Sequence, residues 1–329
     1  MKHDYKNRLA QLALWMAMAA MPLMAAAGNC RGDVNGDGHV TIADVSILID
    51  GLLGNGTMDD DAADVNRNGI VSISDVSTLI DYLLGAFEFP PEEEEFNVNG
   101  VDFVMVPVEG GTFMMGATAE QPSDASDRER PVHQVTVSSF SIGQTEVTQA
   151  LWYAVMGSNP SNFIGSQQPV ERVSWDDCQL FIATLNTLTG KNFRLPTEAE
   201  WEFAARGGNN SQGYRYAGGN DLSVVGWYSY NDSWVLTGTG AHGTHEVATR
   251  MPNELNIFDM SGNVHEWCND WYAGYSNEAV TNPTGPDSGS NRVYRGGSWY
   301  FDEWFSRVSF RNSVIPSYRS HGIGIRLAL

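Results

Sequence analysis

The sequence predicts an α+β domain with little regular secondary structure, preceded by a small all-α module made of two copies of one unit. Three observations support this fold class. The chain has 329 residues, which is enough for two domains. Two similar loop–helix segments stand 31 residues apart near its start. Beyond residue 103, short alternating stretches and two strong helix signals precede a long region rich in Gly, Asn, Tyr and Trp.

Composition places the chain among folded proteins and excludes several function classes. Apolar residues make up 42% and charged residues 18%, which excludes wholesale disorder. The formal net charge of −21 has the wrong sign for a nucleic-acid partner or an anionic membrane surface. Three cysteines exclude a scaffold built from disulfides, and because their number is odd their pairing stays open.

Residues 1–27 have the order of a secretory signal. Three basic residues among the first eight precede an apolar stretch over residues 9–24, and small residues follow it. We expect cleavage after Ala27 and export to an extracellular, cell-surface or periplasmic location. A membrane span is not expected, because the run is short and Pro22 interrupts it. A lipid anchor on Cys30 is the less favoured alternative, since Asn29 stands where a small residue is usual.

The first folded elements are two loops with the spacing of calcium ligands. Residues 33–44 and 64–75 carry oxygen-bearing side chains at alternate loop positions, with glycine at position 6, where the turn needs positive φ. A single such loop is also compatible with an ordinary Asx-rich turn, but two in phase favour calcium. The predicted calcium ligands are Asp33, Asn35, Asp37, His39, Thr41, Asp44, Asp64, Asn66, Asn68, Ile70, Ser72 and Asp75.

Each loop leads into a helix with one apolar face, formed by Val45, Leu48, Ile49, Leu52 and Leu53 in the first copy and repeated 31 residues later. Residues 30–86 as a whole resemble a type I dockerin, a duplicated EF-hand-like module. The resemblance implies calcium as cofactor and a cohesin-like protein as partner. Dockerins usually contact cohesins through hydroxyls at loop positions 10 and 11. Those positions are Ile42-Ala43 and Ile73-Ser74 here, so the type of cohesin stays open.

Next, Pro90, Pro91 and four glutamates predict an extended, acidic Pro/Glu linker over residues 87–99. The large domain then spans residues 100–329. We expect strands at 103–108 and 135–137. Capping boxes at Ser174 and Thr197 predict helices over about 174–188 and up to the glycines at 207–208. The region beyond residue 208 has little periodicity, and bound ions would be needed to keep it compact.

Three long motifs in this domain carry a specific resemblance. RLPTEAEWEFAARGG at 194–208, DMSGNVHEW at 259–267 and RGGSW at 295–299 resemble the formylglycine-generating enzyme (sulfatase-modifying factor) family. The likeness covers about residues 103–329 and implies a C-type-lectin-like fold stabilised by calcium. It also implies that Asp259, Gly262, Val264 and Glu266 hold a calcium ion. The alternative for Asp259 and Glu266 is a polar turn and an ion pair.

The family's chemistry is not expected here. The family enzyme oxidises a cysteine of a sulfatase to formylglycine, with copper held by two cysteines in the segment after Gly-Gly-Ser. Residues 296–311 contain no cysteine, and Cys178 and Cys268 stand elsewhere. Soft thiolates are what select Cu(I), so copper is not expected. A formylglycine-generating oxidase with an unrecognised metal arrangement remains the alternative function.

The C-terminal segment favours binding instead. Between apparent framework residues it carries aromatic, hydroxyl and carboxylate side chains, which is the composition of a binding surface. This layout resembles the variable proteins of diversity-generating retroelements. An unknown protein or glycan, such as a polysaccharide, would be the ligand; the aromatics as core residues are the alternative. The predicted ligand-binding residues are Tyr300, Phe301, Asp302, Trp304, Phe305, Phe310, Ser313, Val314, Ile315, Tyr318, Ser320 and His321.

Overall fold

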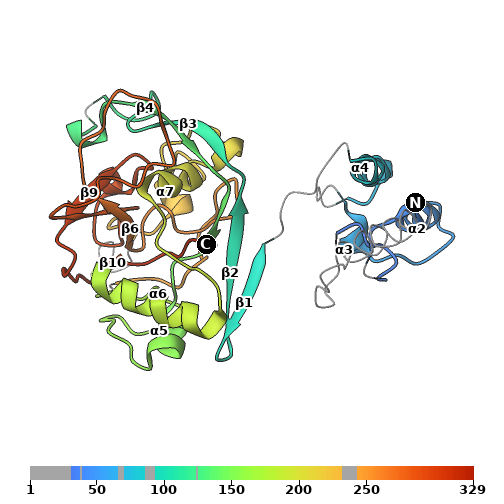
Figure 1. Cartoon of the computed structure of the whole chain (residues 1–329), viewed down its shortest axis with the longest axis horizontal. Coiled ribbons are helices and arrows are strands. Elements are labelled where there is room, and N and C mark those ends of the chain that lie inside the picture. The colour runs from blue at the N-terminus through green and yellow to red at the C-terminus, as the bar shows by residue number, and fades with distance from the viewer. Residues whose placement is uncertain (1–30, 38, 66–69, 86–92, 124, 232–242) are drawn as a thin grey trace, which may run out of the picture. The chain divides into compact units, whose positions relative to one another are not determined.

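The computed structural model describes residues 31–37, 39–65, 70–85, 93–123, 125–231 and 243–329 (Figure 1). It divides into two compact units, Met1–Pro90 and Pro91–Leu329. The predicted signal segment 1–27 lies outside the described residues. Among the residues that are described, no helix is long and apolar enough to cross a membrane.

The small unit contains the two predicted helices, α2 (Ile42–Leu52) and α4 (Ile73–Leu83), and a short α3 (Asp60–Ala63). Thr41 and Ser72 cap α2 and α4 in matching capping boxes, each closed by the aspartate three residues on. The predicted apolar face is only partly buried. Val45 and Leu48 lie in the core with their repeats Val76 and Leu79, whereas most other apolar residues of the two helices remain at least partly exposed, namely Ile42, Ile49, Leu52, Leu53, Ile73, Ile80 and Leu84.

The large unit has ten strands in three small sheets among its described residues. The first has the order β1 (Glu94–Val98), β2 (Val101–Val108) and β5 (Phe140–Gly143). The second contains β3 (Gly111–Met115), β4 (His133–Val137) and β7 (Val280–Thr281). The third has the order β10 (Ile323–Gly324), β6 (His265–Trp271), β8 (Arg292–Arg295) and β9 (Arg311–Val314). The mixed fold with short strands agrees with the predicted class.

Strand β1 corrects the predicted linker, which was too long. Residues 94–98 pair with β2 in an antiparallel hairpin, and Asn99 and Gly100, both with positive φ, form its turn. The Phe96 ring stacks on Phe103 at 5.2 Å and meets Phe193 at 5.1 Å. Apolar burial on one face of the strand therefore outweighs the repulsion among the preceding glutamates. The rest of the predicted linker, 87–92, lies outside the described residues.

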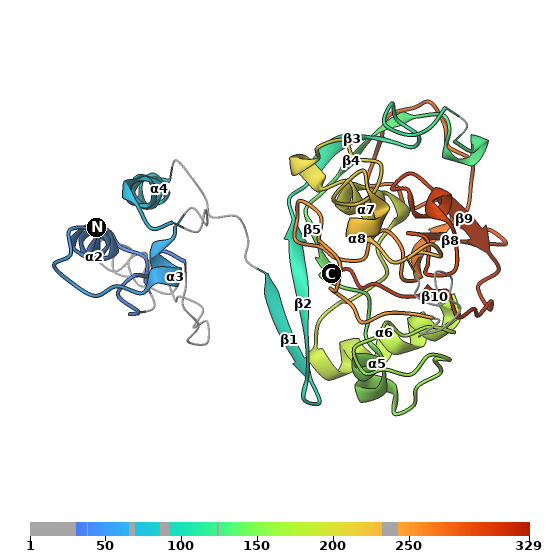
Figure 2. The same cartoon turned by 180° about the vertical axis from the view of Figure 1, so that it is seen from behind.

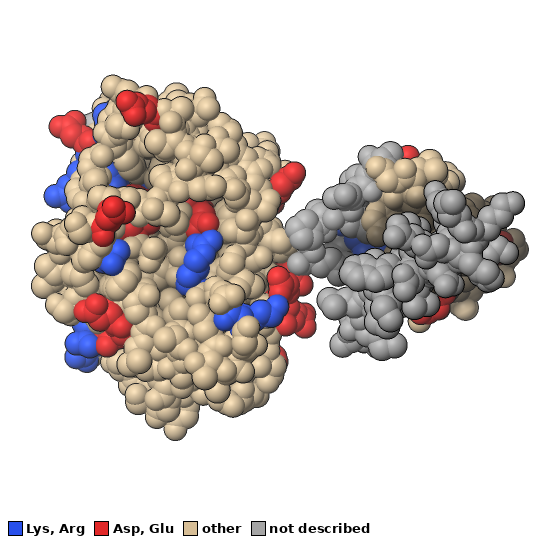
Figure 3. All heavy atoms as spheres, in the orientation of Figure 1, with Lys and Arg blue, Asp and Glu red and all other residues tan. Residues whose placement is uncertain are grey.

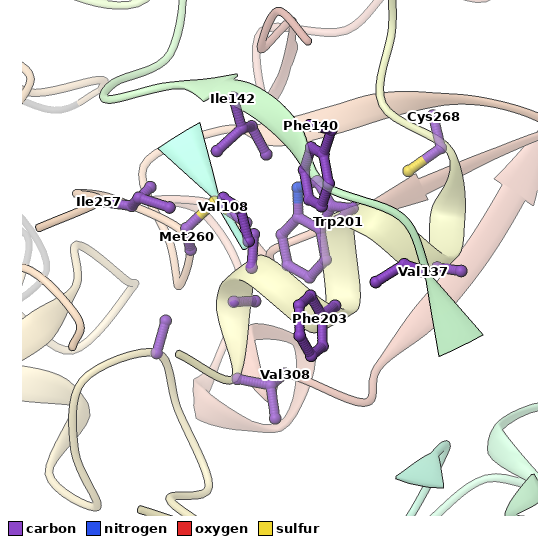
Figure 4. Packing of buried hydrophobic residues seen from close by; sticks show 14 of the residues in the cluster. Val108, Val137, Phe140, Ile142, Trp201, Phe203, Ile257, Met260, Cys268 and Val308 are labelled. Atoms are coloured by element: carbon purple, nitrogen blue, oxygen red, sulfur yellow. The ribbon is translucent and has the colours of Figure 1, made fainter. Parts of the chain in front are cut away.

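In the described part of this unit four α-helices accompany the sheets: α5 (Gln149–Met156), α6 (Trp175–Thr189), α7 (Glu198–Ala205) and α8 (Leu222–Val225). The helices predicted at 174–188 and from Thr197 are α6 and α7. Helices α5 and α6 lie side by side at one end of the unit in both views (Figures 1 and 2). Helix α7 is central, because Trp201 and Phe203 point into a core with Val108, Phe140 and other apolar residues (Figure 4).

Candidate ligand-binding face

The C-terminal segment is attached to the core by buried arginines. Arg307 donates two hydrogen bonds to Glu129, at 2.7 and 2.8 Å, and both side chains are almost fully buried. Arg311 does the same to Glu198 at 2.7 and 2.5 Å. Burial by itself raises the pKa of Glu129, but the hydrogen bonds from Arg307 and Ser309 and the charge of Arg307 outweigh it and lower the pKa. The segment is therefore held by ionised pairs below its surface.

A second group of buried ion pairs connects the C-terminal part of the chain to α7. Arg295 pairs with Glu202 and Glu198, and Arg206 pairs with Glu202 and Glu120. A short helical turn, η3 (Glu303–Ser306), then returns the chain toward the buried Arg307, and Asp302 caps it through the Trp304 N–H. Residues 300–305 consequently form an outward loop on a rigid support.

Aromatic rings form a continuous network above this support. Phe163 meets Trp299 at 5.1 Å between ring centroids, and Trp299 meets Tyr300 and His321, each at 5.4 Å. Tyr300 continues to Phe301 at 5.6 Å. His265, below Phe301, contacts both Phe301 and Tyr294, which joins the loop to the β8–β9 part of the sheet. We call the exposed and half-buried part of this network the aromatic face, formed by Phe163, Tyr300, Phe301 and His321; Trp299, only 1% exposed, is the buried ring that they contact.

The predicted ligand-binding residues divide by exposure. Five are exposed: Tyr300, Asp302, Ile315, Tyr318 and His321. Six are half-buried: Phe301, Trp304, Phe305, Ser313, Val314 and Ser320. Phe310 is only 6% exposed. Val314 is partly buried against a core cluster that contains Phe181 and Trp267. The prediction for Phe310 was wrong because the residue lies between Ser309 and Arg311, both drawn inward by buried acidic partners.

Other parts of the chain reach this face and were missed. Phe163 comes from the loop after α5, and the Ser229 N–H donates to the Phe301 carbonyl at 3.0 Å. That bond brings the segment of Tyr228 and the exposed Tyr230 beside the aromatic face. No local pattern marks these residues, because each comes from a region without helix or strand periodicity.

The residues predicted to hold calcium in this domain are buried. Glu266 accepts hydrogen bonds from Arg326 at 2.7 Å and from Trp201 Nε1 at 2.6 Å. Asp259 Oδ2 accepts from the Ala248 N–H, while Oδ1 has no partner among the described residues. Burial raises the pKa of Asp259 to about 6. The ion pair anticipated as the alternative for Glu266 is present, and calcium held by Asp259, Gly262, Val264 and Glu266 stays a prediction.

In the first loop of the small unit, side-chain oxygens of the predicted ligands accept hydrogen bonds from backbone N–H groups of the loop. The Asp37 N–H is shared by Asp33 Oδ1 and Asn35 Oδ1, and the Asn35 N–H donates to Asp44 Oδ1 at 3.1 Å. Asp44 and its repeat Asp75 are fully buried. In the second loop, Asn66 and Asn68 lie outside the described residues. Within the described part, no three His, Cys, Asp or Glu side chains form a metal-binding group, so these ligands also remain predictions.

The donors for copper are not in place. Cys178 and Cys268 are buried free thiols in two different core clusters, and burial raises the pKa of each. At the aromatic face the residue before Arg307 is Ser306, which is buried and whose hydroxyl has no partner among the described residues. A serine hydroxyl is a hard, neutral donor, whereas Cu(I) selects thiolates. The described residues at this face do not fit a copper site; Cys30 lies outside the described residues.

Comparisons with known proteins agree with both resemblances. Residues 91–329 match the sulfatase-modifying factor enzyme 1-like domain, and residues 31–84 match the dockerin type I domain. The formylglycine-generating enzyme of Streptomyces coelicolor is 31% identical over 68% of this chain and 88% of its own length. Chaperone protein LppX of Paenibacillus barcinonensis is 35% identical over 63% of this chain and 82% of its own length.

Solved structures extend the comparison. Treponema denticola variable protein 1 has a TM-score of 0.64 and 32% identity, covering 72% of this chain and 99% of its own. PvdO from Pseudomonas aeruginosa has a TM-score of 0.57 and 25% identity, and the match covers 74% of this chain and 99% of PvdO. The motifs, the fold and these matches lead to one conclusion: the chain belongs to the sulfatase-modifying factor enzyme 1-like family and carries a type I dockerin domain ahead of that domain.

Proposed function

We propose that this is an exported binding protein that captures a protein or glycan ligand on its aromatic face and is attached to an assembly through its dockerin. The observation that carries the proposal is the contrast at residues 296–311. Donors for copper are missing there, while exposed Tyr300 and His321 stand in an aromatic network on buried ion pairs. Rigid aromatic side chains give contact area at low cost in conformational entropy.

The similarity to a variable protein of Treponema denticola supports a binding role for this surface. If this chain works like a variable protein, the buried arginines Arg307 and Arg311 keep the loop in place, while the residues between such arginines differ from one protein to another. Tyr300, Asp302, Tyr318 and His321 are the exposed positions that would contact the ligand most directly.

The dockerin supplies the attachment. Type I dockerins bind calcium and a cohesin partner, and calcium at the two predicted loops would fix α2 and α4 relative to each other. Ile42 and Ile73, exposed at the start of these helices, stand at loop position 10 in place of the usual hydroxyl, while Ser74 keeps a hydroxyl at position 11 of the second loop. We therefore expect a cohesin-like partner with an apolar contact surface.

A glycan and protein-fragment array probed with the full-length chain tests the binding role. Replacing Tyr300 and Tyr318 together by Ala should abolish capture and leave the fold intact, because both side chains are exposed. Leu180→Ala, which removes an exposed apolar side chain from α6, serves as the control and should retain capture. Unchanged capture by the double variant rejects this placement of the site.

The similarity to formylglycine-generating enzymes favours a second candidate, an oxidase that makes formylglycine from a sulfatase cysteine. Incubation with copper, oxygen and a cysteine-containing sulfatase peptide distinguishes the two. Formation of formylglycine, detected by mass spectrometry, would support the oxidase and contradict the binding proposal.

Calcium in the large domain is part of the proposal as well. Asp259 has a buried carboxylate oxygen without a partner among the described residues, and it interacts electrostatically with the buried acids Glu146 and Glu266. A divalent cation would neutralise this excess of negative charge. Metal analysis of the dialysed protein should therefore give more calcium than the two dockerin loops account for.

A further inference from the structure

A separate groove lies between α5, the β1–β2 turn and the loop at residues 159–166. Its volume is about 630 Å³, within the ~300–1,000 Å³ typical of small-molecule sites. Its lining includes Tyr153, which is 59% exposed, Ile164, which is 73% exposed, and the small residues Ala150 and Ala154 on the helix between them. Val101 and four polar side chains without charge complete the lining, the polar ones being Asn99, Gln149, Asn159 and Ser166.

Internal hydrogen bonds hold the groove in shape. The buried Gln149 side chain donates to the Phe163 carbonyl at 2.7 Å and accepts from Asn159 Nδ2 at 2.8 Å and from the Gly165 N–H at 3.1 Å. On the opposite side, Asn99 Nδ2 donates to the Ala154 carbonyl at 2.8 Å, which fixes the β1–β2 turn against the end of α5. A ligand would therefore enter a site that needs little rearrangement.

The polar atoms that remain indicate what the groove accepts. Asn99 Oδ1, Ser166 Oγ and Tyr153 Oη make no hydrogen bond with any described residue. An aliphatic side chain seated here would leave such groups unpaired, which is unfavourable. An ionic ligand would find no counter-charge in the lining, and the surface around α5 carries no acidic or basic side chain in Figure 3.

A sugar ring satisfies both conditions, since it has an apolar C–H face for Tyr153 and the alanines and hydroxyls for the neutral polar groups. We propose that this groove binds a neutral oligosaccharide, with the Tyr153 ring as its stacking surface. The groove and the aromatic face consist of different residues, although the loop at 159–166 contributes Phe163 to that face and Ile164 to the groove.

The test uses the full-length chain with calcium and three neutral probes: cellohexaose, mannohexaose and xylohexaose. Hexagalacturonate is the charged counterpart, and acetyl-leucine amide represents an apolar side chain of a protein. Calorimetric titration should detect at least one neutral hexasaccharide, and saturation-transfer NMR should show its ring C–H protons against the protein. Tyr153→Ala should weaken this binding by about tenfold or more, whereas Tyr153→Phe keeps the ring and should lose less.

Tyr300→Ala tests the other site, and if the sugars bind the groove it should weaken the titration much less than Tyr153→Ala does. If Tyr300→Ala removes sugar binding and Tyr153→Ala does not, the sugars bind the aromatic face and the groove proposal is wrong. Absence of binding by all three neutral probes, preferential binding of hexagalacturonate, or binding of acetyl-leucine amide alone would equally overturn it. None of these results depends on whether the aromatic face captures its own ligand.

Discussion

The buried pair of Arg307 and Glu129 should account for much of the stability of the C-terminal segment. In Arg307→Met the Glu129 carboxylate stays buried without its partner, for which the expected loss is about 3–5 kcal/mol in the free energy of unfolding. For a domain of this size the melting temperature should fall by roughly 6–20 °C. Tyr300→Ala, at a residue 55% exposed, should change stability by less than about 1 kcal/mol.

Tryptophan fluorescence during urea unfolding is a suitable assay, because residues 31–99 contain no tryptophan and the signal reports the large unit. The double variant Glu129→Gln with Arg307→Met is the control. It removes both charges, so it should lose less than the sum of the two single losses. A loss below about 1 kcal/mol for Arg307→Met would refute the idea that buried ion pairs hold this segment.

Three further predictions concern stability. Removal of calcium with EGTA should unfold residues 31–84 and reduce helical circular dichroism, and a dockerin unaffected by EGTA would contradict the calcium assignment. Burial, and next the charge of Glu198, raise the pKa of Asp270 to about 7, so its stabilising contribution is complete below its unfolded pKa near 4 and is lost as the pH rises to about 7. Between about pH 4 and 7 the free energy of unfolding should therefore fall less in Asp270→Asn than in the wild type, by up to about 4 kcal/mol. If the dependence of this free energy on pH is the same in both proteins, Asp270 is not its source. Gly226→Ala places a Cβ 1.8 Å from the Ser261 carbonyl oxygen and should destabilise by about 1–3 kcal/mol, whereas Gly274→Ala, with open space around it, should have little effect in the same urea titration.

The sequence predicted the elements that depend on local signals. The capping boxes predicted at Ser174 and Thr197 appear in the structure, and each starts its helix where expected. Strand β1 was missed because the run of glutamates hid the alternation of Phe96 and Val98, whose partners lie on β2 and near Phe193. Local pattern does not report such distant contacts.

For the predicted ligand-binding residues, too, the sequence revealed local chemistry but not distant contacts. The residues between the framework arginines were recognised from their chemistry, but burial of Phe310 is decided by Glu129 and Glu198, more than 100 positions away. Phe163 and the segment of Tyr228 were missed for the same reason, since only the folded chain brings them to residues 299–301.

The loop at residues 159–166 has one further consequence. Phe163 touches Trp299 and His321, while its neighbour Ile164 lines the groove beside α5. A molecule that displaces Ile164 must also shift the edge of Phe163 against Trp299. A ligand of that kind would link the two proposed sites, and thermodynamic linkage would then require the influence to be mutual.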